Sequence, residues 1–106
     1  MIVTAWNNGA HHISGAGYGI KIGAQDRDRF FDRRHASVIM RIEGHSTEFS
    51  VNTNKKTFWN KNCRELIHLQ IGIWLRESRL APWPKDEPPK LDLRRLDGGS
   101  FLLSKR

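Results

Sequence analysis

The sequence has little of three things that define common protein classes: cysteine, long apolar runs and acidic residues. Its single cysteine, Cys63, excludes an internal disulfide framework and is typical of a reducing compartment. No stretch approaches the roughly 18 apolar residues that a membrane-spanning helix needs. Residues 1–8 lack the basic and apolar regions of a signal peptide. We therefore expect a cytoplasmic protein with no membrane partner.

Acidic residues are outnumbered by basic ones, with 11 Asp and Glu against 18 Lys and Arg, so the net charge is +7 over 106 residues. The basic residues recur in short clusters, and concentrated positive charge attracts nucleic-acid phosphates. The same excess also occurs on ordinary solvated surfaces. A membrane surface is disfavoured because no exposed amphipathic basic helix stands out. Nucleic acid is the partner class that the charge favours.

The length and composition predict one domain, residues 1–106. Hydrophobic residues make up 38% of the chain, enough apolar area to offset the entropy lost on folding. Alternating and helical patterns predict strands at 1–5, 18–22, 37–43, 48–52, 90–96 and 100–104, and helices at 25–31 and 61–78. We expect an α+β fold: a small open or pseudo-barrel antiparallel sheet of about six strands, with one long and one short helix.

Three local features refine this expectation. Asp26 is a suitable N-cap for the short helix. Gly72 lies inside the predicted long helix, where it costs roughly 1 kcal/mol relative to alanine, so another element should approach it closely. The leucine spacing near Arg94 and Arg95 breaks strict alternation and predicts a β-bulge.

Two loops have the composition of base-reading segments. Residues 7–19 place His11, His12 and Ser14 on a glycine-rich backbone. Residues 52–62 interleave four asparagines with lysines. Amide side chains can pair with adenine, and lysines hold phosphates or guanine acceptors. Ordinary turn chemistry accounts for either loop alone, because Asn and Gly are common turn residues.

The tryptophans differ in expected role. Trp59 adjoins the second loop and is the candidate for stacking a base. Trp74 lies among the apolar residues of the predicted long helix and is expected in the core. Trp83 sits in the segment from Pro82 to Pro89, where it packs an extended crossing onto the core or docks a partner protein.

The sequence patterns for metal binding, metal-dependent cleavage and nucleotide binding are weaker. Five scattered histidines and one cysteine give no metal-ligand spacing, so we predict neither metal nor cofactor. Asp86, Glu87 and Asp92 lack the lysine that a metal-dependent nuclease hairpin carries. Gly15–Ala–Gly–Tyr–Gly19 matches no nucleotide-binding fingerprint. The Cys63 thiol is expected to be buried.

The stretch from His11 to Phe31, together with Cys63–Arg–Glu–Leu66 and Trp74–Leu75, resembles the B-three type pseudobarrel DNA-recognition domain of plant transcription factors and some bacterial restriction enzymes. The resemblance implies a curled, open barrel that clamps a DNA major groove between two arms. Those arms would fall on residues 7–19 and 52–62.

We therefore expect a non-catalytic module that binds nucleic acid, most specifically duplex DNA. The residues expected at its interface are His11, His12, Ser14, Lys21, Asn52, Asn54, Lys55, Lys56, Trp59, Lys61 and Arg64. One alternative is a small bacterial ribonuclease or toxin-like enzyme, with His11, His12 and a basic residue as acid–base groups. Another is an adaptor subunit of a larger complex, docking through Trp83 and the segment from Pro82 to Pro89.

Overall fold

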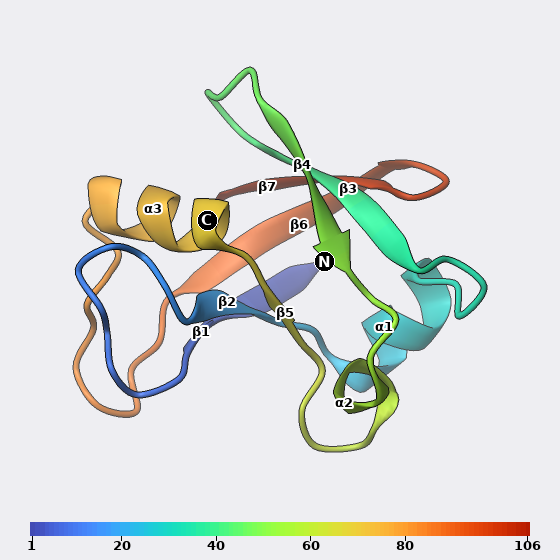
Figure 1. The fold of residues 1–106 in the computed structure, drawn as a ribbon, viewed down its shortest axis with the longest axis horizontal. Coiled ribbons are helices and arrows are strands. Elements are labelled where there is room, and N and C mark those ends of the chain that lie inside the picture. Colours follow the sequence, from blue (N-terminus) through green and yellow to red (C-terminus); the bar gives the residue numbers. More distant parts are fainter.

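The computed structural model describes all 106 residues and shows a strongly curled sheet with three short helices packed around it (Figure 1). The strands are β1 (Ile2–Asn7), β2 (Tyr18–Lys21), β3 (Ser37–Ile42), β4 (Glu48–Asn52), β5 (Glu65–Ile67), β6 (Lys90–Asp97) and β7 (Ser100–Lys105). The helices are α1 (Ala24–Phe30), α2 (Lys56–Trp59) and α3 (Leu69–Glu77). The predicted α+β class is confirmed. No helix has the length and apolarity needed to cross a membrane.

The seven strands form one sheet in the order β4-β3-β7-β6-β1-β2-β5. Every neighbouring pair is antiparallel except β3 and β7, which run parallel. The two edge strands are bridged by side chains: the Phe49 ring of β4 stacks on the His68 ring, directly after β5, with centroids 4.4 Å apart. The sheet is therefore nearly closed into a barrel.

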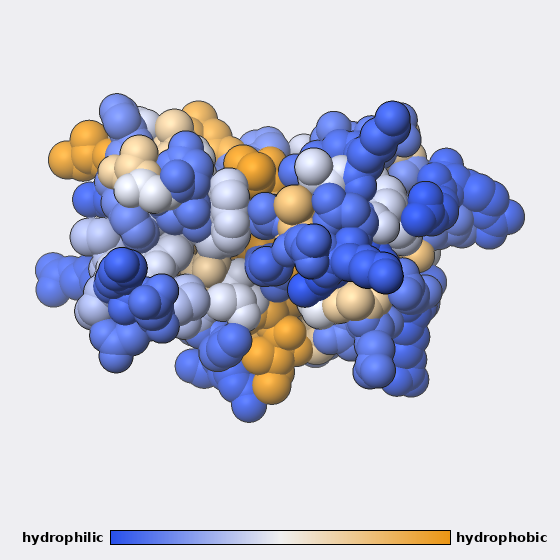
Figure 2. Space-filling model, turned by 90° about the horizontal axis from the view of Figure 1, so that it is seen from below, coloured by the Kyte–Doolittle hydropathy of each residue, from blue (hydrophilic) through white to orange (hydrophobic).

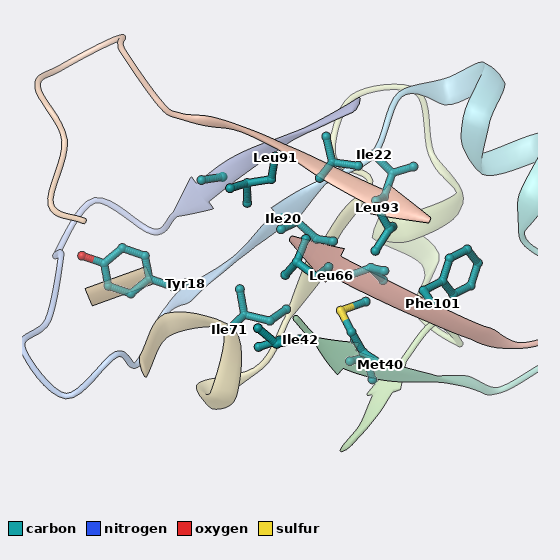
Figure 3. Packing of buried hydrophobic residues seen from close by; sticks show 14 of the residues in the cluster. Tyr18, Ile20, Ile22, Met40, Ile42, Leu66, Ile71, Leu91, Leu93 and Phe101 are labelled. Atoms are coloured by element: carbon teal, nitrogen blue, oxygen red, sulfur yellow. The ribbon is translucent and has the colours of Figure 1, made fainter. Parts of the chain in front are cut away.

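The inside of this barrel is the hydrophobic core, a cluster of 20 buried residues (Figure 3). The predicted alternation holds in β2, where Tyr18 and Ile20 are fully buried while Lys21 is half-exposed. It also holds in β3, where Met40 and Ile42 are buried and Arg41 is exposed. Because each strand has one apolar face, the curled sheet encloses that face and leaves the polar face outside.

The predicted long helix over residues 61–78 is wrong. Glu65–Ile67 is instead the edge strand β5, and only Leu69–Glu77 forms a helix. Arg64 has a positive φ of 60°, which helical backbone excludes, and His68 caps α3 by accepting from the Gln70 amide at 3.0 Å. Residues 61–78 contain more apolar residues than one face of a helix can hold because they belong to two elements. Leu66, for example, packs into the core from β5.

Other boundaries also differ from the prediction. The added β5 makes seven strands rather than about six, and helix α2 begins within the expected loop at Lys56. The N-cap of α1 is Gly23 rather than Asp26, so no side chain caps this helix. The predicted bulge in the last hairpin is confirmed, because the β6–β7 register shifts between Arg95 and Asp97.

Candidate nucleic-acid interface

Two connecting segments flank one face of the barrel. The first arm (residues 8–17) joins β1 to β2, and the second arm (residues 53–64) joins β4 to β5 and contains α2. The first arm meets β2 at Tyr18; the second meets β5 at Glu65, which pairs with Lys21 at the other end of β2. Four strand residues span about 10 Å, so this distance separates the two attachment points.

Both arms lie on the lower side of the molecule in Figure 1, and Figure 2 shows that side face on. Two mainly hydrophilic lobes stand left and right, with a less polar band between them (Figure 2). The first arm belongs to the left side and α2 to the right, with β1, β2 and β5 between (Figure 1). The two arms thus stand on either side of the outward face of β1, β2 and β5, which we call the floor.

The outward residues of β1, β2 and β5 form the floor in two cross-strand rows. One row is Thr4, Lys21 and Glu65, and the other is Trp6, Gly19 and Ile67. Lys21 is thus brought to the floor. Its neighbour Glu65 has the one buried side-chain oxygen in the protein without a hydrogen-bond partner, Oε2. A carboxylate oxygen accepts hydrogen bonds, so Glu65 is a floor residue that the sequence reading missed.

The base of the first arm is held by a polar–aromatic cluster. His11 Nδ1 lies 2.9 Å from the Tyr18 hydroxyl, and its ring packs edge-on against Trp83 with centroids 4.8 Å apart. Arg76 donates to the Tyr18 hydroxyl at 3.2 Å and to the His11 carbonyl at 3.1 Å. His11 therefore braces the arm from inside, and Trp83, half-buried, packs the proline-rich crossing onto it.

The tip of the first arm is exposed. His12 Nδ1 lies 2.7 Å from Ser14 Oγ and accepts from the Ser14 amide at 3.1 Å, so the two side chains fix each other. Ile13 between them is 81% exposed, the most exposed large hydrophobic residue of the chain. An apolar side chain held at a loop tip costs free energy in water, so Ile13 joins His12 and Ser14 as a candidate contact.

The second arm is pinned to α1 by a buried arginine. Arg27 is 8% exposed, and its Nη1 donates to the carbonyls of Phe58 at 3.1 Å and Asn60 at 2.7 Å. Trp59 Nε1 donates to the Thr53 carbonyl at 2.9 Å across the arm. These bonds hold α2 in place, although four residues alone would not form a stable helix.

Several expected interface residues of the second arm serve the arm itself. Arg64 donates from Nε to the Ile22 carbonyl at 2.8 Å and from Nη1 to the Lys61 carbonyl. Asn52, the last residue of β4, accepts at its Oδ1 from the amide of Asn54 in the arm at 2.8 Å, which is ordinary turn chemistry. Cys63, expected to be buried, is half-exposed with a free thiol.

Cationic side chains nevertheless gather on the second arm. Where this arm meets the α1–β3 connection, a hollow of about 450 Å³ is lined, without any carboxylate, by Arg33, Asn54, Lys55, Lys56, Trp59 and Asn60. The Arg33 guanidinium lies over the Trp59 ring at 4.7 Å, so this face of the indole adjoins positive charge. Lys61 is exposed nearby in sequence.

Most of the positive charge of the protein is not neutralised internally. Only three of the 18 Lys and Arg residues form ion pairs, in the pairs Arg27–Asp28, Arg34–Asp32 and Arg106–Asp92. Lys21, Lys55, Lys56 and Lys61 have no carboxylate partner. Their ammonium groups remain available to an external anion.

The remaining expectations concern metal and acid–base chemistry. No three His, Cys, Asp or Glu side chains come together in a way that would hold a metal ion. His11 and His12, adjacent in sequence, bond different partners, the first Tyr18 and the second Ser14. Comparison of the chain with protein-family models, curated proteins and solved structures finds no match to any of them.

Proposed function

We propose that this protein is a non-catalytic nucleic-acid-binding module that holds duplex DNA across the floor between its two arms. The observation that carries the proposal is the placement of both arms on one side of the barrel, at opposite ends of β2 and β5 (Figure 1). A major groove about 12 Å wide has the scale of the roughly 10 Å between the arm bases.

The chemistry of the two arms supports different tasks. The second arm supplies uncompensated Lys55, Lys56 and Lys61, which suit phosphate oxygens. The first arm presents His12, Ile13 and Ser14 at its tip, a mixture of hydrogen-bonding and apolar groups that suits base edges. The floor adds Lys21 and the Glu65 acceptor between them.

Rigidity also supports binding. Both arms are braced to the barrel by side chains, through Arg76 and Tyr18 for the first and Arg27 for the second. A binding segment that is already ordered loses less conformational entropy on association. The barrel-like sheet is also the architecture that the resemblance to pseudobarrel DNA-recognition domains implies.

The proposal is tested by fluorescence anisotropy with a labelled duplex of ~20 base pairs at several salt concentrations from ~50 mM to ~200 mM. The double variant K55Q/K56Q removes two candidate phosphate contacts. The slope of log K against log salt is negative, and each lost contact makes it shallower by about 0.9, so it should become less negative by about 2 in the double variant.

The matched control is R41Q/K105Q, which removes the same charge from β3 and β7, at the top of Figure 1. Its salt slope should stay close to that of the unmodified protein. Equal losses in both double variants would show a non-specific charge effect and contradict the two-arm interface. Absence of duplex binding at ~50 mM salt would reject the function itself. Metal-free cleavage of RNA, abolished by H12A, would favour the ribonuclease alternative instead.

A further inference from the structure

A second concavity, separate from the floor, lies where four chain segments meet beside the second arm. It has a volume of about 420 Å³ and is bounded by the end of α1, the α1–β3 connection, Trp59 of α2 and the β6–β7 hairpin. This volume falls within the range of small-molecule sites, roughly 300–1,000 Å³. None of the residues that bound it, apart from Trp59, belongs to the expected interface.

The bottom of this concavity is aromatic. Phe31 and Phe101 are stacked with their planes 10° apart and their centroids 4.6 Å apart, and they are 7% and 0% exposed. Trp59 forms part of the wall and is half-buried. Phe31 and Phe101 cover each other, so the aromatic surface that a planar ring can reach is that of Phe30 and Trp59, which also line the concavity and are half-buried. Stacking on such a surface requires no particular hydrogen-bond pattern.

The rim of the concavity carries three arginines without a carboxylate partner, two of which lie over aromatic rings: Arg29 over Phe30 at 5.1 Å and Arg33 over Trp59 at 4.7 Å. Arg29, Arg33 and Arg95 line it, are exposed, and form neither an ion pair nor a side-chain hydrogen bond. Guanidinium groups bind phosphate through paired N–H donors. Three of them around one hollow give a local environment suited to an anion.

The two rim carboxylates are already neutralised. Asp28 accepts from Arg27 Nε at 3.0 Å, and Asp32 accepts from Arg34 Nη2 at 2.7 Å. Hydrogen bonds from the Arg34 side chain lower the pKa of Asp32 well below its usual range, so this carboxylate stays ionised and paired. The charge left over in the concavity therefore comes from the three arginines.

The hairpin side of the concavity is bordered by glycine. The β6–β7 turn consists of Gly98 and Gly99, and both line the concavity. Neither carries a side chain that could cover the opening there. His35, whose ring has no hydrogen-bond partner, adds a donor or acceptor at the same opening.

From these contacts we infer that the concavity binds a single nucleotide unit, with the base against Phe30 and Trp59 and the phosphate on Arg29, Arg33 and Arg95. The shared chemistry is that of a nucleoside monophosphate. It is supplied either by a free nucleotide or by a nucleotide turned out of a strand held by the arms, which costs least at a mismatched pair. The choice of a nucleotide as the ligand rests on the proposed function, whereas the argument for a binding site rests on the residues of the concavity alone.

The test uses the whole chain and two kinds of probe. Free deoxynucleoside and ribonucleoside monophosphates are titrated to ~5 mM while amide and indole resonances are followed by NMR, and labelled duplexes with and without one mismatched pair are compared by anisotropy. The amides of residues 28–35 and 95–101 and the Trp59 indole should shift with mononucleotide. Tighter binding of the mismatched duplex than of the fully paired one would identify a nucleotide turned out of the strand as the ligand. Equal binding of the two duplexes, together with shifts caused by mononucleotide, would identify the free nucleotide.

Arg95 has a matched control beside it. R95Q should weaken mononucleotide binding at least ~10-fold, the loss expected for a charge-assisted phosphate contact, whereas R94Q should change it less than ~2-fold because Arg94 does not line the concavity. Equal losses in the two variants, or no shift with any probe, would overturn the inference.

The failures of the two proposals are distinguishable. If the fully paired duplex binds through Lys55 and Lys56 but the concavity shows no shifts, only the nucleotide site is rejected. If mononucleotide binds and the duplex does not, the duplex function is rejected and the nucleotide site remains.

Discussion

Gly72 of α3 and Gly15 of the first arm meet backbone to backbone. A Cβ added to Gly72 would lie 2.6 Å from the Gly15 carbonyl carbon and would overlap its oxygen, and a Cβ added to Gly15 would lie 2.7 Å from the Ile73 nitrogen. This contact fixes the first arm against α3. The close approach expected at Gly72 from its cost within a helix is confirmed.

G72A should destabilise the protein although alanine is the better helix former. The helical gain is about 1 kcal/mol, but the overlap is with backbone rather than a flexible side chain, so the first arm must move. We expect a net loss of about 1–3 kcal/mol in the free energy of unfolding, measured by urea denaturation. G98A is the control, since its Cβ meets nothing, and it should stay within about 0.5 kcal/mol. Wild-type stability in G72A would contradict the contact.

His68 should make folding stability depend on pH. Burial lowers the pKa of His68 from its ordinary 6.5, so the unfolded chain binds more protons than the folded chain in this region. Stability is therefore fully present above pH 6.5 and falls as the pH drops through that value into the lowered folded-state range. Protonation of Nδ1 would also remove the acceptor that caps the Gln70 amide.

The measurement is the urea midpoint between pH ~7.5 and ~5.5. H68N keeps a capping side chain and does not titrate, so its midpoint should fall less on acidification than that of the wild type. H45N, at an exposed turn position, should keep the wild-type dependence. Identical pH profiles for the wild type and H68N would show that His68 is not the source.

Arg27 should be among the most sensitive polar positions. R27M keeps most of the buried side-chain volume but leaves the Phe58 and Asn60 carbonyls without their charged donor. We expect a loss of about 2–4 kcal/mol in the free energy of unfolding and weaker duplex binding, because α2 loses its attachment to α1. R29M, on the same helix but exposed, should lose less than about 0.5 kcal/mol. Similar losses in both would indicate a general effect of removing charge from α1.

The sequence predicted the fold best where one residue pattern belonged to one element. Alternation in 37–43 and 48–52 identified the β3–β4 hairpin, and the leucine spacing in 90–96 identified the bulged β6. The pattern failed over residues 61–78, where the apolar residues of β5 and α3 run together. A three-residue edge strand carries too short a pattern to be recognised, and only its pairing with β2 defines it.

For the candidate site, sequence composition located the two loops but not the roles of their residues. Lys55 and Lys56 lie on an exposed cationic surface, whereas His11 and Arg64 bond within the protein. Neither role has a sequence signal, because the partners Tyr18, Arg76 and Ile22 are decided by how distant segments pack. Arg95 was missed as a candidate ligand-binding residue for the same reason.

The sequence by itself determined the class of the fold, the excess of positive charge and the apolar faces of most strands, since these depend on residue type and local period. Only the tertiary structure decided where that charge is free. Closure of the sheet brings the arms to one side and gathers Arg29, Arg33 and Arg95, from segments more than sixty residues apart, around one hollow. Contacts between distant residues determine which cationic side chains bond to carboxylates or carbonyls within the protein. No local sequence pattern carries that information.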